Sequence, residues 1–391
     1  MTTNIETTFK TLVCFIVCDS GPAGHFAAFS KSLYQDNGPY HIEIHASGPA
    51  LAKLQDSNLP DGIKVVSFQL NRLASTEEEE KLAKELNNKC HQQNARLIIT
   101  DIGNKFDIKL QEFSSAITNN SWTYYDNPEV FVPGGYSLIA HETIKKSKNV
   151  LFANMNLAKA NGLPDIDLTN KTLYGVGYYP TEQAEMIYRR RITEKTTHRA
   201  QFFAKHKLNE LQYHQIFVYF GGNNQVYFEH AFPAFLSFLR DAIQQNETTF
   251  LFLIQQHPAA KQENLDGKMV TKLMQDNNIK CSVLLSDLTS DQAQILADGA
   301  MYYQTSMGPQ FALAGIPVMQ VGHDIYDDVL VRNRLSYTAT DSHEFIAGLR
   351  KMQQQNTNDD NDKLNEQKQL IYQAIGYNPN WSKNLEELIK R

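Results

Sequence analysis

Short apolar runs alternate with amphipathic segments along the first half of the chain. The apolar runs have the length and composition of buried strands, and they fall at residues 11–18, 41–45, 64–70, 96–100, 122–125, 150–153 and, more weakly, 173–176. Helical periodicity lies between them, at residues 26–35, 50–56, 77–92 and 108–117. Strands that alternate with helices predict a parallel sheet with helices on both faces.

The same alternation restarts after a long polar segment at residues 180–208, which we predict to be one helix. Strands are then predicted at residues 216–220, 250–255, 280–285, 300–303 and 317–321, and helices at residues 227–244, 262–276, 291–297 and 308–314. The chain is therefore predicted to be an α/β protein with two doubly wound, Rossmann-like domains that face a central cleft.

The domain boundaries follow from this pattern, and a length of 391 residues suits two domains. Residues 1–208 are expected to form the N-terminal domain and residues 209–352 the C-terminal domain. The remainder, residues 353–391, begins with the polar stretch QQQNTNDDND, which we expect to be a loop. The helices after it could pack back on the N-terminal domain.

Composition and charge exclude several classes of partner. Lysine and arginine total 37 and aspartate and glutamate 43, so the net charge of −6 gives no electrostatic reason to expect nucleic acid. No apolar run approaches the roughly 18 residues of a membrane helix. The apolar run after Lys10 lacks a small-residue cleavage site, so we expect no secretory signal. A cytoplasmic protein is expected, with export as an effector left open.

The cysteines show no pattern of a metal site. Cys14, Cys18, Cys90 and Cys281 form no C-x-x-C pair and no zinc spacing with histidine. We therefore expect buried free thiols in a reducing compartment, no metal and no cofactor.

The most specific turn is in YQTSMGPQFALAGIPVMQVG at residues 303–322, since ligands of open α/β sheets bind beyond the carboxyl ends of the strands. Thr305, Ser306, Met307 and Gly308 lead there from a strand into a helix that contains Gln310. Free backbone N–H groups at a helix start suit a diphosphate, and glycine permits close approach of the backbone. The turn is a predicted phosphate site.

This stretch resembles the nucleotide-binding domain of GT-B-type glycosyltransferases and of the related UDP-GlcNAc 2-epimerases. Both carry a small-residue turn, a helix with a glutamate, then G-x-P and a strand. The resemblance in architecture covers roughly residues 11–345, whereas residue identity is confined to the turns. It implies a GT-B-like fold and a nucleotide-sugar donor, most simply a UDP-sugar.

The chain departs from the family at two places. Gln310 stands where the family's acidic residue contacts the nucleotide ribose, so that contact would be uncharged here. Retaining members use a Glu-x7-Glu pair in this region, and no glutamate occurs between Glu263 and Glu344. The resemblance therefore implies an inverting, metal-independent transfer.

Other turns of the second domain complete the candidate donor site that the resemblance implies. They contain Gly221, Gly222 and Asn223 near the donor phosphates, His257 near the donor, Leu285 where backbone groups would hold the base, and Asp324 near sugar hydroxyls. Each has a structural alternative: a tight turn for the glycines, a structural role for the histidine and a helix cap for the aspartate.

In the first domain, CDSGPAGHF at residues 18–26 resembles the glycine-rich first loop of the lipid II N-acetylglucosaminyltransferase, which also ends in Gly-His before a helix. The loop is neither a G-x-G-x-x-G fingerprint nor a Walker A loop. We expect His25 at the helix start, where the dipole would lower its pKa and favour the neutral, base-competent form. The alternative is an ordinary residue in the first turn of the helix.

A second candidate base lies in YYDNPE at residues 124–129, followed by VPGGY. Sugars are held by aromatic faces together with carboxylate and amide groups, so Asp126 and Glu129 are candidate catalytic bases. The alternative is a structured proline- and glycine-rich loop.

Three hypotheses follow from these residues and from the resemblance. The first is a glycosyltransferase that moves a sugar from a nucleotide-sugar donor to an acceptor hydroxyl of a glycan, lipid or protein. The second is a nucleotide-sugar 2-epimerase. The third is a non-catalytic nucleotide-sugar-binding or interaction protein, for example a bacterial effector.

Overall fold

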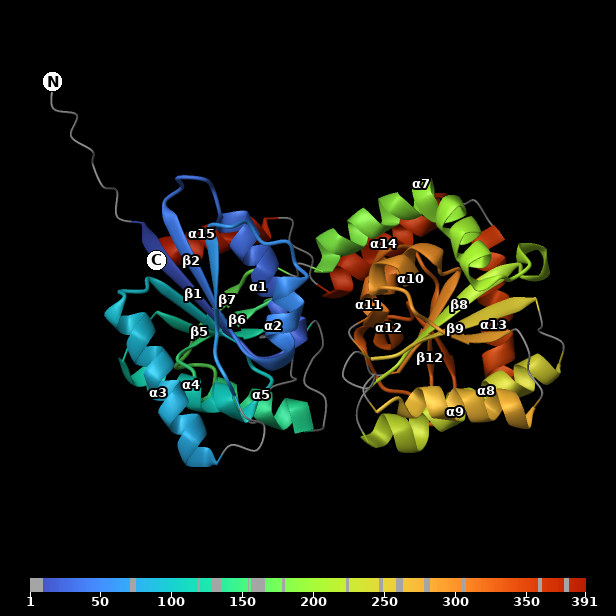
Figure 1. Ribbon diagram of the computed structural model, residues 1–391, viewed down its shortest axis with the longest axis horizontal. Helices are drawn as coiled ribbons and strands as arrows, with labels where there is room; N and C mark the ends of the chain where they lie inside the picture. The colour runs from blue at the N-terminus through green and yellow to red at the C-terminus, as the bar shows by residue number, and fades with distance from the viewer. Residues whose placement is uncertain are drawn as a thin grey trace, which may run out of the picture. The chain divides into compact units, whose positions relative to one another are not determined.

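The computed structural model describes residues 10–391 except 71–74, 118–119, 128–134, 154, 156–165, 178–179, 223–224, 246–248, 258–262, 278–281, 304, 306, 358–360 and 376–379. The chain divides into two compact units, one of Met1–Tyr179 with Gly376–Arg391 and the other of Pro180–Ile375. Each unit is an α/β layer structure (Figure 1), which confirms the predicted fold class.

The first unit contains a parallel sheet with the strand order β3-β2-β1-β4-β5-β6-β7. Its strands are β1 (Thr11–Val17), β2 (Tyr40–Ala46), β3 (Ile63–Ser67), β4 (Leu97–Thr100), β5 (Ser121–Tyr125), β6 (Asn149–Phe152) and β7 (Thr172–Gly175). Its helices are α1 (Ser20–Leu33), α2 (Gly48–Gln55), α3 (Thr76–Gln92), α4 (Lys105–Ile117), α5 (Gly135–Lys146) and α15 (Trp381–Lys390). The strand order reverses between β1 and β4, as in doubly wound folds.

Alternate residues of β1 serve two cores, because successive side chains of a strand point to opposite faces. Leu12, Cys14 and Ile16 pack against α3 and α4. On the other face Phe15 meets Phe26 of α1, with ring centroids 5.1 Å apart. A strand covered on both faces must be apolar throughout, which is why the sequence predicted it.

The second unit repeats the arrangement with the order β10-β9-β8-β11-β12-β13. Its strands are β8 (Gln215–Phe220), β9 (Phe250–Gln255), β10 (Val283–Leu285), β11 (Gly299–Tyr302), β12 (Val318–Val321) and β13 (Tyr337–Ala339). Its helices are α7 (Pro180–His206), α8 (Phe232–Gln244), α9 (Leu265–Asp276), α10 (Ser290–Leu296), α11 (Met307–Leu313), α12 (Val329–Arg332), α13 (Ser342–Thr357) and α14 (Asn361–Ile375), with the short turns η1 (Glu210–Gln212) and the π-helical η2 (Tyr227–Ala231). The strand order reverses between β8 and β11.

The unit boundaries differ from the predicted domain limits at two places. Helix α7 groups with the second unit, whereas the sequence analysis placed residues up to 208 in the first domain. Helix α14 also belongs to the second unit, while α15 belongs to the first, where Trp381 packs against Phe29 with centroids 5.6 Å apart.

The polar stretch at residues 353–362 is largely helical, so the predicted loop is wrong for most of its length. Helix α13 continues to Thr357, and α14 begins at Asn361. Met352 is fully buried in the core of the second unit and anchors the last turns of α13. Glutamine is a good helix former, so the polar residues can extend a helix that tertiary packing has already fixed.

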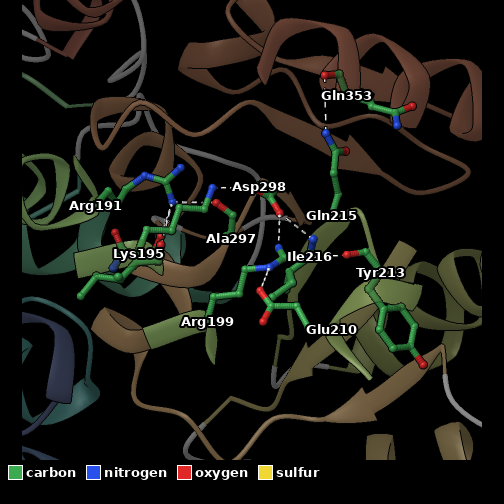
Figure 2. A network of polar contacts seen from close by, with 12 residues as sticks. Arg191, Lys195, Arg199, Glu210, Tyr213, Gln215, Ile216, Ala297, Asp298 and Gln353 are labelled. Carbon is green, nitrogen blue, oxygen red and sulfur yellow. Dashed lines mark hydrogen bonds and ion pairs between the residues drawn. The ribbon is translucent and has the colours of Figure 1, made fainter. Parts of the chain in front are cut away.

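Helix α7 is tied to the amino end of the second sheet by a network around Asp298 (Figure 2). The Asp298 carboxylate accepts hydrogen bonds from the backbone N–H of Ile216 at 2.7 Å, from Arg199 Nη1 at 3.3 Å and from Lys195 Nζ. Arg191 Nη1 donates to the carbonyl oxygens at the end of α10, including that of Ala297 at 2.6 Å. Arg191 therefore caps the carboxyl end of α10, and burial lowers its pKa to about 10.

Among the described residues, no helix is long and apolar enough to cross a membrane.

Candidate functional site

The candidate site of the first unit lies where the strand order reverses, at the carboxyl ends of β1 and β4. Asp101, directly after β4, joins the two loops. Its Oδ2 accepts hydrogen bonds from the backbone N–H groups of Cys18 at 3.2 Å and Asp19 at 3.0 Å. Its Oδ1 accepts one from Ile102 at 2.6 Å. The glycine-rich loop after β1 is therefore held in place by the side chain of Asp101.

Acidic side chains crowd around this point. Asp101 and Asp107 are fully buried, and Asp19 and Asp126 are partly exposed. Burial, and then the charges of Asp19 and Asp126, raise the pKa of the Asp101 carboxyl to about 8. Burial and the charge of Asp101 likewise raise the pKa of Asp107 well above its usual range. Like charges disfavour ionisation of their neighbours, so the acidic cluster favours the protonated form of Asp101.

Asp126 is the carboxylate that faces the glycine-rich loop. It follows β5, and its Oδ2 would lie 3.5 Å from a Cβ atom placed on Gly21. Asp19, on the same loop, accepts a hydrogen bond from Asn104 Nδ2 at 3.2 Å. A side chain at position 21 would therefore start in van der Waals contact with the Asp126 carboxylate.

His25 lies in the second turn of α1, because the helix begins at Ser20 and not at the histidine. Its ring is 7% exposed, and Nδ1 lies 2.8 Å from the hydroxyl oxygen of Tyr124. Burial lowers the pKa of His25 to about 3. The pKa of His25 is thus lowered, as expected, but the cause is burial. The effect of the helix dipole is small here because it falls off after the first turn.

In the second unit, Gly221 and Gly222 follow β8 and pack against Tyr227. A Cβ atom on Gly221 would lie 2.8 Å from the Tyr227 hydroxyl oxygen, and one on Gly222 would lie 2.9 Å from Cγ of the same ring. Tyr227 is 1% exposed and begins the π-helical segment η2. Such segments often occur at functional sites, and here the tight turn is required by the tyrosine.

The other strand at this reversal, β11, leads into the predicted phosphate site. Thr305 Oγ1 accepts a hydrogen bond from the N–H of Met307 at 3.3 Å, and the Gly308 N–H donates to the Thr305 carbonyl at 3.3 Å. A Cβ atom on Gly308 would lie 2.9 Å from the Tyr302 ring. Gln310 is partly exposed on α11. The turn thus already satisfies two of its own N–H groups.

Three other predicted residues lie at carboxyl ends of neighbouring strands. His257 follows β9 and is partly exposed, and burial lowers its pKa, while the charge of Asp266 acts the other way. Leu285 ends β10 and its side chain packs against the core, which leaves only backbone groups for a ligand. Asp324 follows β12 and is exposed.

Asp328, four residues after Asp324, is a buried helix cap. Its Oδ1 accepts from the N–H groups of Leu330 at 2.9 Å and Val331 at 2.8 Å. Its Oδ2 accepts from Tyr302 at 2.7 Å and Gln320 at 2.8 Å.

Glu129, Asn223 and Ser306 lie outside the described residues. The sequence analysis missed Asp19, Asp101 and Asp107. The signal for Asp101 was its place directly after the apolar run at residues 96–100, where the carboxyl end of a strand was expected.

Comparison with known proteins shows a likeness in structure only. No protein-family model matches the chain, and no curated protein matches it in sequence. The UDP-GlcNAc 2-epimerase of Neisseria meningitidis, solved bound to UDP-GlcNAc, aligns with a TM-score of 0.68 at 13% identity over 97% of this chain and 100% of that one.

Two further solved structures show a similar likeness in fold. A glycosyltransferase from Rickettsia africae aligns with a TM-score of 0.62 at 12% identity over 97% of this chain and 98% of that one. The UDP-GlcNAc 2-epimerase of Methanocaldococcus jannaschii, solved with UDP-GlcNAc and UDP, gives 0.62 at 12% identity over 88% of this chain and 92% of that one. The likeness establishes the architecture: the chain has the two-domain α/β fold of GT-B-like proteins.

Proposed function

We propose that the protein is an enzyme acting on a nucleotide sugar, and that it transfers the sugar to an acceptor hydroxyl. One observation carries the proposal: in both units the candidate residues lie at the carboxyl ends of the strands at or near the reversal of strand order, where doubly wound sheets bind ligands. The structural neighbours support a UDP-sugar, since two of them were solved with UDP-GlcNAc.

The first unit would supply the catalytic base, and Asp126 is the better candidate than His25. A general base must reach the proton of the acceptor and remain unprotonated at working pH. Asp126 is partly exposed and faces the loop at Gly21, whereas His25 is buried with Nδ1 against the Tyr124 hydroxyl. Asp101 and Asp107 accept backbone hydrogen bonds and act as supports of the loops.

The second unit would hold the nucleotide. Backbone groups after β8 and β11 would meet the diphosphate, and the loop after β10 would meet the base of the nucleotide. Backbone N–H groups of these loops would stabilise the leaving diphosphate without a metal, and the lack of a Glu-x7-Glu pair favours an inverting transfer. Gln310 would contact the ribose through its amide.

A thermal-shift screen tests the nucleotide. The full chain is heated with UDP, GDP, CMP or dTDP, and we expect UDP to raise the melting temperature most, since a ligand at about 100 times its Kd stabilises the folded state by about 2.7 kcal/mol. If none of the four nucleotides shifts the transition, the proposed donor class is wrong.

The ribose contact is tested by Gln310→Glu, which restores the acidic residue that the resemblance implies. We expect UDP to bind about tenfold more tightly, equivalent to about 1.4 kcal/mol. The matched control is Gln292→Glu, which adds the same charge at an exposed capping-box position. Unchanged UDP affinity in Gln310→Glu would place the ribose elsewhere.

A 2-epimerase is the second candidate, favoured by the acidic cluster of the first unit. Epimerisation at a carbon centre needs an acid and a base on one sugar, and environments that separate two carboxyl pKa values provide such pairs. Asp101, whose pKa burial and the charges of Asp19 and Asp126 raise to about 8, would supply the acid of such a pair.

The two activities separate in deuterated buffer with UDP-GlcNAc and no acceptor. An epimerase that removes a carbon-bound proton incorporates solvent deuterium into the sugar, whereas a transferase returns the substrate unlabelled. Transfer to an added acceptor without label supports the first proposal.

A further inference from the structure

A cluster of buried side chains in the first unit is separate from the candidate site. Cys14 lies in the middle of β1, His45 lies on β2, and Cys90 lies in the last turn of α3. One ligand atom from each of the three lies within 4.8 Å of the other two. All three side chains are 0% exposed. Three soft or borderline ligand atoms therefore converge on one point inside the sheet–helix layer.

The imidazole in this cluster is poorly satisfied by the protein. Neither ring nitrogen of His45 makes a hydrogen bond, although Nε2 lies 3.3 Å from Glu43 Oε2. Glu43 is 1% exposed, and its Oε2 also has no hydrogen bond. Buried polar atoms in native proteins nearly always have a partner, because an unsatisfied one loses its hydration without compensation. The unsatisfied imidazole points to a missing ligand.

We propose that Cys14, His45 and Cys90 bind one Zn²⁺ ion. Thiolate and imidazole are the ligands of zinc sites, whereas Ca²⁺ and Mg²⁺ prefer oxygen. With Nε2 turned toward Glu43, Nδ1 of His45 is the nitrogen left for the metal. Glu43 then fixes the tautomer of the ring, as carboxylates commonly do for histidine ligands. Water takes the fourth tetrahedral position.

The charges of the site balance. Each thiol releases its proton on binding, so the two thiolates neutralise the ion. The Glu43 carboxylate is already paired through Oε1 with Lys64 Nζ at 2.8 Å. The ion would therefore bring no net charge into the interior, and it would link two neighbouring strands to the helix that covers them.

Sequence spacing did not reveal this site, and the sequence analysis expected no metal. Zinc motifs are recognised when ligands lie a few residues apart. Here the ligands come from two strands and a helix and meet only because β1 pairs with β2, with Cys14 opposite Glu43 in the register.

Metal analysis of the full chain tests the proposal. Protein is produced in zinc-supplemented medium, dialysed, and measured by inductively coupled plasma mass spectrometry. We expect about one zinc per chain in the wild type and its loss in Cys14→Ser and Cys90→Ser. The matched control is Cys18→Ser, a buried thiol of the same core outside the cluster, which should keep the metal.

Cobalt gives a second readout that does not need the variants to fold. Co²⁺ added to the zinc-free wild type should give the thiolate-to-cobalt charge-transfer band in the near ultraviolet and the visible bands of tetrahedral cobalt. Wild-type protein with no zinc and no such spectrum overturns the proposal, as does zinc retained in full by folded Cys90→Ser. A Cys14–Cys90 disulfide in the purified chain, seen as the loss of two hydrogen masses, also overturns it.

Discussion

Asp101 and Asp298 are buried aspartates beside equivalent strands of the two sheets, but at opposite ends. Asp298 precedes β11 at the amino end, and its carboxylate meets Arg199, Lys195 and the N–H of Ile216. Asp101 follows β4 at the carboxyl end, where its charged neighbours are other carboxylates. The environment of Asp298 neutralises the charge of its carboxylate, whereas the environment of Asp101 opposes ionisation of its carboxyl group.

This difference distinguishes a structural role for Asp298 from a candidate functional role for Asp101. A buried carboxylate with cations around it is compatible with a stable fold, whereas carboxylates crowded together raise one another's pKa and cost stability. Titratable groups with strongly shifted pKa values cluster at functional sites, although structural ion-pair networks also shift pKa values. The carboxyl end of the first sheet therefore carries the candidate chemistry, and the amino end of the second sheet carries the attachment of α7.

The largest expected effect is on turnover in Asp126→Asn. If Asp126 is the base, its loss should lower turnover of the nucleotide sugar by about 10²- to 10⁴-fold with little change in nucleotide affinity. Steady-state kinetics and a calorimetric titration with UDP measure the two quantities. Turnover equal to wild type would remove Asp126 as the base.

The next effect is on stability in Asp298→Ala. Removing the carboxylate leaves Lys195 and Arg199 partly buried without it and the Ile216 N–H unpaired, so we expect a loss of about 3 kcal/mol in urea unfolding. The matched control is Asp287→Ala, which removes an exposed pair with Lys205 on the same helix and should cost less than about 1 kcal/mol. Equal losses would contradict the scaffold role of Asp298.

Asp101→Asn should change how stability depends on pH. The pKa of Asp101 is raised from 3.8 to about 8 on folding, so the folded state holds the proton longer than the unfolded state. Stability from this group is therefore lost as pH rises toward 8, by at most about 1.4 kcal/mol per pH unit.

Above pH 6.5 the titration of His25, whose pKa falls from 6.5 to about 3, no longer contributes. Burial also raises the pKa of Asp107, which contributes a decline of the same sign, so urea unfolding between pH 6.5 and 8 should show a steeper decline in the wild type than in Asp101→Asn. Parallel pH profiles would mean that Asp101 is ionised in the folded protein.

The smallest effect is expected from Tyr124→Phe, which removes the hydroxyl beside His25 Nδ1. We expect a loss of about 1 kcal/mol in stability and turnover near that of the wild type. Tyr219→Phe is the control, since the buried Tyr219 hydroxyl has no hydrogen bond to lose. A large fall in turnover for Tyr124→Phe alone would return His25 to the role of base.

The fold could be predicted because its central strands are covered on both faces. Such strands are apolar throughout, as in TLVCFIV of β1, and they stand out from polar turns. The short strand β13 and helix α12 carry too few residues to show a period, and the helical residues after Met352 depend on packing that the sequence does not display.

The candidate site was predicted less well for a related reason. The turn after β4 reads as an ordinary polar loop, and Asp101 gains its role only because β1 and β4 are neighbours in the sheet. The burial of His25 depends in the same way on Tyr124, which is distant in sequence. The glycine turns could be predicted from local motifs. The ionisation of a side chain depends on contacts between segments that are distant in sequence, which local motifs do not display.

Hydrogen–deuterium exchange with and without UDP-GlcNAc would locate the ligand on the two sheets. We expect slower amide exchange in peptides covering residues 18–27, 101–107 and 219–222, at the carboxyl ends of the strands. Peptides around Ile216 and Asp298, at the amino end of the second sheet, should be unchanged. Binding that protects the amino end and leaves the carboxyl ends unaffected would contradict the account.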